Sequence, residues 1–236
     1  PPRSTLSSSS AASDVYKRQT QGGVSIRANL DGSIGDIYAR TNTGTVSVDG
    51  IPVASAQPDE FIGNAQPDAL VGWSNQLRYK DFSLNFLIDA RVGGYVFSQT
   101  STGLDRDGVS KRSLQYRESG ILVDATVADT SEMNTKSISA QEYWQAMADV
   151  SANYVYGQDN IRLREISIGY QLPSMPKFGI ESATLQLVGR NLFFFSKDAE
   201  DIDPESMVGT TLGIQGINEN AMPTAKSVGL NLSLNF

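Results

Sequence analysis

Cysteine and histidine are both absent from the 236 residues of this chain. Without cysteine, the chain forms no disulfide bond and offers no thiolate to a metal or a redox centre. Without histidine, it lacks the side chain that most often serves as general base and metal ligand near neutral pH. Ser-His-Asp and Cys-His catalytic centres are therefore excluded within the chain. We expect it to be no enzyme and to hold no metal or cofactor.

Positive charge and long apolar runs are also scarce. The 19 lysines and arginines are outnumbered by 26 acidic residues, which gives a net charge of −7. Nucleic acid is not an expected partner, because phosphate binding needs clustered basic side chains. No run approaches the ~18 apolar residues of a transmembrane helix. A transmembrane β-strand needs only about 9–11 alternating residues, so a membrane location stays open.

The first part of the chain lacks an apolar stretch of the kind found in a secretion signal. Residues 1–19 are rich in serine and without periodicity, and we expect residues 1–21 to be disordered. The run DVYKRQ at 14–19 resembles a translated sequencing adapter. We therefore interpret this segment as a junction, and expect the natural N-terminus of an exported protein to be missing. Residues 22–236 form the second predicted region.

The clearest predicted strand covers residues 227–236. Apolar side chains alternate there with small or polar ones, and the apolar positions are Val228, Leu230, Leu232, Leu234 and Phe236. Successive side chains of a strand point to opposite faces, so all of these apolar residues share one face.

Residues 71–79 and 82–92 alternate in the same way, and only Lys80 and Asp81 separate them. This spacing predicts a tight antiparallel hairpin. In the second strand, the even-numbered residues from Phe82 to Val92 are apolar. We expect them to face outward and Asp89 and Arg91 to face inward.

Two further strands are predicted at 161–171 and 183–190. The alternation of the first slips by one residue near Arg164-Glu165, which predicts a β-bulge or an inward-facing Leu163. Weaker strand candidates lie at 24–28, 34–40 and 45–50.

The connections between the clear strands fall into two classes. Those at 79–81 and 172–181 are short, and those at 93–158 and 196–225 are long. Because antiparallel strands reverse direction, the short connections share one rim and the long ones share the other. Outer-membrane barrels are built this way, whereas a soluble sandwich has no reason to sort its loops. Aromatic residues near the short connections suit an interfacial girdle, and they are Tyr79, Phe82, Tyr170 and Phe236.

These patterns predict an all-β fold, an antiparallel transmembrane β-barrel segment with about six strands of a larger barrel and an open sheet in this chain. A charged residue on the lipid side of such a sheet costs about 2–4 kcal/mol near the midplane. The charged residues of the strands should therefore face the lumen, pair with acids, or lie near a rim. The candidate lumen-facing residues are Arg78, Asp89, Arg91, Arg162, Arg164 and Arg190.

Several ordered segments of the chain resemble one family, the SusC/RagA-type TonB-dependent outer-membrane transporters. They are FIGNAQPD at 61–68, LRYKDFSLNFLIDARVGG at 77–94, NIRLREISIGYQLP at 160–173, LVGRNLFFF at 187–195, DIDPES at 201–206 and MPTAKSVGLNLSLNF at 222–236. Each segment is weak evidence alone, but together they run in the family's order over residues 61–236. The chain departs from the family mainly by omission of the plug, the TonB box and most strands.

The resemblance implies the C-terminal part of a 22-stranded, plugged barrel in the bacterial outer membrane, within the lipid bilayer. It implies import of glycan or peptide nutrients, with energy from the TonB complex acting through the missing plug. It also implies a SusD-like surface lipoprotein as partner. The barrel-assembly machinery would recognise the terminal strand through Leu232, Leu234 and Phe236.

The long connections contain three further candidates. Asp105-Arg106-Asp107-Gly108 faintly resembles the start of a calcium loop, but Tyr116 stands where such a loop needs glutamate, so a polar turn is favoured. Ser139 and Glu142 predict a capping box for a short helix. Tyr143 and Trp144 on that helix could stack on sugar rings, although packing is the favoured interpretation. The acidic run at 197–205 is expected to be a solvated loop.

Two rival functions remain for the sequence. A structural or adhesive outer-membrane barrel would share the strand pattern, and a plug with a TonB box upstream would exclude it. A soluble β-sandwich that binds or cleaves carbohydrate would stay soluble without detergent. The glycosidase version would also need a carboxylate pair that the sequence does not reveal.

Overall fold

The computed structural model describes residues 15–29, 34–173, 177, 179–199, 201–207 and 215–235. These residues form two compact units. The first unit comprises the chain up to Gln66 together with the segments Gly94–Gly157 and Ser206–Ala221. The second comprises Pro67–Gly93, Gln158–Glu205 and Met222–Phe236. In the first unit, residues from the part before Gln66 and from the two long connections share one core.

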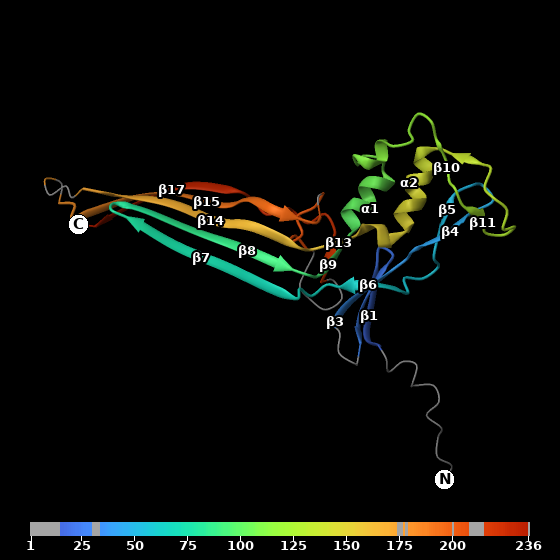
Figure 1. Ribbon diagram of the computed structural model, residues 1–236, viewed down its shortest axis with the longest axis horizontal. Helices are drawn as coiled ribbons and strands as arrows, with labels where there is room; N and C mark the ends of the chain where they lie inside the picture. The colour runs from blue at the N-terminus through green and yellow to red at the C-terminus, as the bar shows by residue number, and fades with distance from the viewer. Residues whose placement is uncertain are drawn as a thin grey trace, which may run out of the picture. The chain divides into compact units, whose positions relative to one another are not determined.

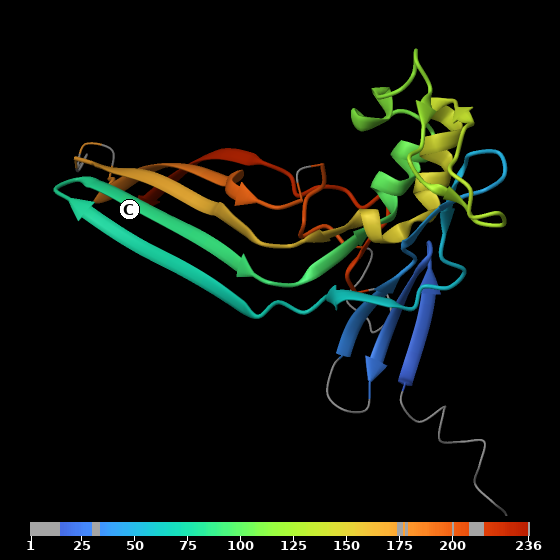
Figure 2. The same cartoon turned by 45° about the vertical axis from the view of Figure 1, so that its right-hand side comes forward.

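The second unit is one antiparallel sheet of five long strands in the order β17-β15-β14-β8-β7. Their bounds are Ala69–Tyr79 for β7, Phe82–Val92 for β8, Asn160–Leu172 for β14, Ser182–Lys197 for β15 and Ser227–Asn235 for β17. Figures 1 and 2 both show these strands side by side. Within the described residues the outer strands β7 and β17 each pair on one side only, so the sheet is open as predicted.

The register of this sheet joins the apolar positions of all five strands into one face. One row of cross-strand partners runs Tyr79, Phe82, Tyr170, Leu185 and Leu232. The next row runs Leu77, Leu84, Ile168, Leu187 and Leu230. Cross-strand partners lie on the same face, so the alternation in the sequence becomes a two-faced sheet. Many side chains of the apolar face are half-exposed in this chain.

The predicted bulge is confirmed on β14. Leu163 is paired with Ile88 and Glu165 with Leu87, so Arg164 is the extra residue. The insertion returns Ile166 and the residues after it to the face that Leu163 occupies before it. One inserted residue therefore removes the conflict between the two phases of the sequence.

The first unit contains a four-stranded sheet and three small ones. The larger sheet has the order β1-β2-β3-β6, with bounds Val15–Gln21, Val24–Asn29, Ile34–Ala39 and Glu60–Asn64. The small sheets join β4 (Asn42–Val46) with β5 (Pro52–Ala54) and β11 (Thr126–Val127), β9 (Tyr95–Ser98) with β13 (Val155–Gly157) and β16 (Ile217–Asn218), and β10 (Ile121–Leu122) with β12 (Ser137–Ile138).

Four helices lie in the same unit. They are α1 (Gln99–Arg106), α2 (Ala140–Asp149) and the short 3₁₀ helices η1 (Arg112–Leu114) and η2 (Ser151–Tyr154). Among the described residues, no helix combines the length and the apolar character that a membrane crossing requires.

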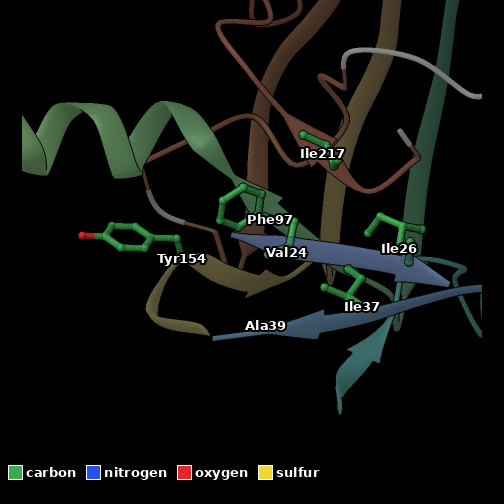
Figure 3. Packing of buried hydrophobic residues seen from close by; sticks show 8 residues of the cluster. Val24, Ile26, Ile37, Ala39, Phe97, Tyr154 and Ile217 are labelled. Carbon is green, nitrogen blue, oxygen red and sulfur yellow. The ribbon is translucent and has the colours of Figure 1, made fainter. Parts of the chain in front are cut away.

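The core of the first unit collects apolar side chains from distant parts of the chain. Val24 and Ile26 of β2 pack with Phe97 of β9, Tyr154 of η2 and Ile217 of β16 (Figure 3). All are buried. Parallel pairing of β16 with β9 fixes the third segment against the second.

Residues 15–21, which were expected to be disordered, form a strand in the structure. These residues form β1, which pairs along its length with β2. Gly22 and Gly23 make the turn with positive φ angles of 59° and 83°, a conformation that favours glycine. A polar strand needs no apolar periodicity when it only completes the edge of an existing sheet, so the sequence pattern gave no indication of it. Residues 1–14 lie outside the described residues.

Candidate functional site

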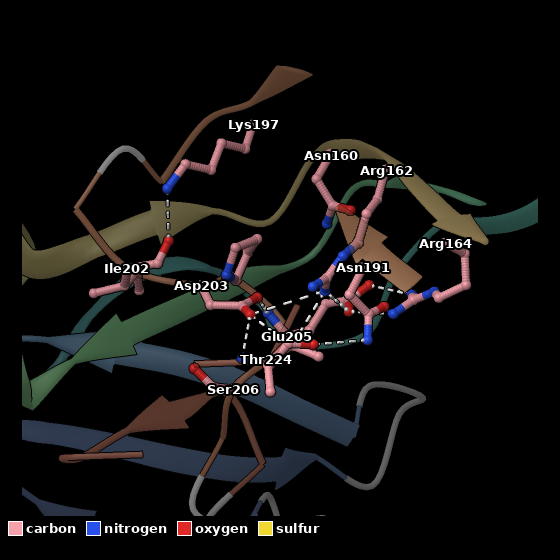
Figure 4. Close-up of polar contacts among 12 residues, drawn as sticks. Asn160, Arg162, Arg164, Asn191, Lys197, Ile202, Asp203, Glu205, Ser206 and Thr224 are labelled. Carbon is pink, nitrogen blue, oxygen red and sulfur yellow. Dashed lines mark hydrogen bonds and ion pairs between the residues drawn. The ribbon is translucent and has the colours of Figure 1, made fainter. Parts of the chain in front are cut away.

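A cluster of ion pairs lies on the polar face of the five-stranded sheet, where β14 begins (Figure 4). Arg162 Nη1 donates a hydrogen bond to Glu205 Oε2 at 2.8 Å. Arg164 holds both oxygens of the same carboxylate, at 2.9 and 2.7 Å. The Nε of Arg164 donates to Asp89 Oδ2 at 2.6 Å. One carboxylate is therefore shared by two guanidinium groups, and one of these also binds a second carboxylate.

Asp203 and Thr224 complete the cluster. The hydroxyl and the backbone N–H of Thr224 both donate to Asp203 Oδ2, at 2.6 and 2.9 Å. Arg162 Nη1 also donates to the Thr224 hydroxyl at 3.2 Å. Burial favours the neutral form of Asp203, but hydrogen bonds from Thr224 and from the Glu205 N–H, and the charge of Arg162, outweigh it. The pKa of Asp203 consequently lies below its ordinary value.

Local sequence places these groups on one face. Asp89 is the cross-strand partner of Arg162, so the two lie on the same side of the sheet. Arg164 reaches this side as the extra residue of the bulge. Asp203 and Glu205 come from the connection after β15, within the run DIDPE at 201–205. Of the six candidate lumen residues, the structure brings together Asp89, Arg162 and Arg164.

The other three candidates are placed differently from one another. Arg190 pairs with Glu165 at 2.8 Å in an exposed ion pair. Arg78 lies exposed in the outer strand β7, opposite Ser83. Arg91, near the end of β8, lines a cavity of about 420 Å³ together with Asp89, Arg164 and Glu205.

Uncharged hydrogen bonds continue the polar face along the sheet. Ser167 of β14 accepts hydrogen bonds from Asn85 of β8 and Gln186 of β15, both at 3.0 Å. The face is thus lined with amides and hydroxyls between the charged cluster and the short turns. Such groups can meet water or a polar ligand without cost.

The predicted helix in the first long connection is confirmed as α2, with its capping box. Ser139 accepts from the Glu142 N–H, and the Glu142 carboxylate accepts from the Ser139 N–H. The hydrogen bonds that the Ser139 N–H and the Ser139 hydroxyl donate to the Glu142 carboxylate lower the pKa of Glu142. Trp144 is only 9% exposed, its Nε1 donates to Gln115 O, and Arg112 lies over its ring. Its ring faces are therefore not open for stacking on a sugar.

Tyr143 is half-buried and makes an edge contact with Tyr116. Burial, aided by Tyr116, raises the pKa of the Tyr143 phenol. Beside this helix, a surface cavity of about 760 Å³ is lined by polar groups that include Arg117, Gln141 and Gln145. Trp144 also lines this cavity.

Asp105, the first residue of the faint calcium motif, has protein partners instead. Its carboxylate accepts from the Tyr154 hydroxyl at 3.0 Å and pairs with Arg112 Nε at 2.5 Å. Burial first, and the nearby carboxylate second, raise the pKa of Tyr154. The described residues contain no group of acidic side chains placed to hold a metal ion. The motif is therefore a structural element of the first unit.

Comparison with known proteins gives relatives in one group. No family model matches the chain. TonB-dependent receptors P3 and P26 of Formosa agariphila are 25% and 27% identical to it over 196 and 194 residues. The alignments cover 80% and 78% of this chain but 18% of each relative. The chain thus spans about a fifth of the length of these curated relatives.

Solved structures of the RagAB peptide importer in its closed-closed and open-open states also match. They have TM-scores of 0.56 and 0.58 at 18% and 17% identity, and the matches cover 94% and 93% of this chain and 25% and 24% of theirs. The resemblance to SusC/RagA-type TonB-dependent transporters is confirmed. The five-stranded sheet accordingly has the fold of an antiparallel transmembrane β-barrel segment, as predicted.

Sequence reasoning missed the acidic half of the cluster on the polar face. The run 197–205 was expected to be a solvated loop, but the Asp203 side chain is 7% exposed and Glu205 binds two arginines. That expectation is wrong for these two residues, because their partners are distant in the sequence: Arg162 and Arg164 lie 43 and 41 residues before Glu205, and Thr224 lies 21 residues after Asp203. The only sequence indication was the excess of arginines over acids at the start of β14.

Proposed function

We propose that this chain forms part of the barrel wall of an outer-membrane importer that draws its energy from the TonB complex. The observation that supports this most directly is the register of the five-stranded sheet. It joins most apolar side chains of the five strands into one face and most polar ones into the other. One face suits the lipid bilayer and the other a hydrated lumen. The relatives named as TonB-dependent receptors support the same conclusion.

The proposed cargo is a nutrient of the glycan or peptide class, taken up with the help of a SusD-like surface lipoprotein. A peptide is the first class to test, because the solved structures with this fold are of a peptide importer. Polar side chains beside α2, among them Arg117 and Gln141, are candidates for contacts with the cargo. Tyr143 remains a candidate, whereas Trp144 would act through packing.

The test uses the full reading frame that contains this chain, expressed in a bacterial host that lacks related importers. Uptake of a fluorescent peptide mixture and of a labelled oligosaccharide mixture would be measured separately, with and without a functional TonB complex. We expect uptake of one class that disappears without TonB. Surface localisation without TonB-dependent uptake of either class would favour a structural or adhesive barrel instead.

We further propose that the terminal strand directs assembly into the outer membrane. Leu232 and Leu234 lie on the apolar face of β17, while Phe236 lies outside the described residues. A terminal aromatic after an alternating strand suits recognition by strand addition. Phe236→Ser in the full-length protein should lower the amount in the outer membrane, with Asn231→Ser on the polar face as the control. Equal outer-membrane levels for both variants would contradict this assignment.

A further inference from the structure

The run Asp201–Glu205, here called the acidic strap, lies over the start of β14 and is bound to it mainly through charge. Pro204 and Ile202 are buried, and the Pro204 carbonyl accepts from Gln158 Nε2 at 3.0 Å. Lys197 Nζ donates to the Ile202 carbonyl at 3.0 Å. The strap therefore has a defined position, although it belongs to no strand or helix.

The surface beneath the strap is polar rather than apolar. Gln158, Asn160 and Arg162 follow one another at alternate positions and are each at most 3% exposed. Within the described residues, Gln158 Oε1, Asn160 Oδ1 and Arg162 Nε have no hydrogen-bond partner. Buried polar atoms without partners are rare and unfavourable. Each of these atoms opposes the closed arrangement, because opening of the strap would expose it to water.

Ion pairs must offset the unfavourable burial of these polar atoms, and Glu205 makes most of the ion pairs. It joins Arg162 to Arg164, and Arg164 is tied in turn to Asp89 of the neighbouring strand. Removal of Glu205 would be unfavourable chiefly at Arg162, since that guanidinium is buried whereas Glu205 and Arg164 are partly exposed. Without Glu205, the nearest carboxylate to Arg162 is Asp203, at 3.8 Å. Glu205 thus supplies the shortest ion pairs between the strap and β14.

A hydrogen-bonded contact also joins the strap to the other end of the long connection. Asp203 binds both the hydroxyl and the N–H of Thr224, which lies shortly before β17. The two ends of the segment between Asp203 and Thr224 are therefore fixed together at the same point of β14. Substitution of Glu205 would therefore weaken the attachment of both Asp203 and Thr224 to β14.

We propose that the acidic strap is a releasable latch, held on β14 by Glu205, which opens locally while the five-stranded sheet remains folded. Unpartnered buried polar atoms beneath the strap and one bridging carboxylate favour local opening over opening of the whole sheet. The latch controls whether the base of the connection between β15 and β17 is bound to the sheet or free.

Amide hydrogen exchange of the full-length protein in lipid nanodiscs tests the latch directly. The reporting groups are the N–H of Glu205, which donates to Asp203 Oδ1, and the N–H of Thr224. Glu205→Gln should accelerate exchange at both amides by at least about tenfold, which corresponds to a loss of about 1.4 kcal/mol. Exchange in the middle of β14, around Ser167, should stay within about twofold of the unsubstituted protein, a negligible change on the same scale.

Glu165→Gln is the matched control. It removes a carboxylate from an arginine on the same sheet at the same 2.8 Å distance, but its pair with Arg190 is exposed and holds no loop. Exchange at Glu205 and Thr224 should not change in this variant. Should Glu205→Gln fail to assemble, Thr224→Val removes one hydroxyl of the cluster and should accelerate the same amides to a smaller extent.

Two results would overturn the proposal. Unchanged exchange at positions 205 and 224 in the Glu205→Gln variant, or in Thr224→Val where that is the variant measured, would mean that the strap does not depend on the cluster. Acceleration of equal size in the middle of β14 would mean that the cluster stabilises the whole sheet rather than a latch. Neither readout depends on the transported cargo, so failure here is separate from failure of the proposed import function.

Discussion

Substitution of Leu230 and Leu234 by arginine tests whether the apolar face of the sheet meets lipid. Both residues lie on this face of β17, Leu230 in the middle of the strand and Leu234 near its end. Leu230 is 70% exposed in this chain and Leu234 is 39% exposed. Leu230 is therefore the more exposed residue in this chain, but in a bilayer it would lie nearer the midplane than Leu234.

The bilayer and a protein core predict opposite orders of cost. Arginine on the lipid face costs about 2–4 kcal/mol at the midplane and about 0–1 kcal/mol near the interface. In a bilayer, Leu230→Arg should therefore lower the free energy of unfolding by about 2 kcal/mol more than Leu234→Arg. If the face instead packed on protein or met water, the less exposed Leu234 would be the costlier position.

The assay is urea unfolding of the full-length protein reconstituted into lipid vesicles, followed by tryptophan fluorescence. Asn231→Arg is the control, because residue 231 neighbours Leu230 but lies on the polar face. This variant should change the free energy of unfolding by less than about 1 kcal/mol, as expected for a hydrated surface. A larger cost at Leu234 than at Leu230 would refute the assignment of the apolar face to lipid.

Three further predictions concern single contacts. The pKa of Asp203 is depressed in the folded protein, so its carboxylate stabilises the folded connection at pH values above the ordinary Asp pKa. This stabilisation should be lost as the pH falls through the lowered pKa of the folded state. Loss of Thr224 N–H protection that is already complete above the ordinary Asp pKa in an acid titration would contradict this. Ser139→Ala should cost α2 about 1 kcal/mol of local stability, measured by hydrogen exchange of its first turn, with Ser119→Ala as an unchanged control. Gly63→Ala places a methyl group against the Tyr95 ring and should lower the free energy of unfolding of the first unit by about 1–3 kcal/mol. Gly229→Ala is the control, because open space surrounds Gly229, and it should lower this free energy less. Equal melting temperatures of the two variants would rule out the clash.

Strands whose neighbours follow closely in the sequence were the predictable part of this molecule. The hairpin of β7 and β8 and the bulge at Arg164 both follow from period-two alternation, which is a local property. The capping box at Ser139 and Glu142 is local as well. Apolar alternation predicts faces reliably because a shift of one residue would move every side chain to the other side.

Pairings between distant segments were not predictable in the same way. Glu205 and Arg162 are separated by 43 residues, so the acidic run alone indicates only a solvated loop. Likewise, β1 is polar and its place beside β2 depends on an existing sheet edge. The six arginine and aspartate candidates share a position within or beside strands, and only the structure places Asp89, Arg91, Arg162 and Arg164 close to Glu205, apart from Arg78 and Arg190.

The core of the first unit also determines when this unit can complete its folding. Its side chains come from β2, β9, η2 and β16, so Val24 and Ile217 pack together although nearly the whole chain separates them. Contacts between such distant residues slow folding, because a large loop must close before they form. Phe97 receives its last neighbours, and its N–H gains the carbonyl of Gly216, only after β14 and β15 have been synthesised. This unit therefore completes its fold late, and a chain shortened before residue 215 would leave the apolar side chains of β2 and β9 without their cover.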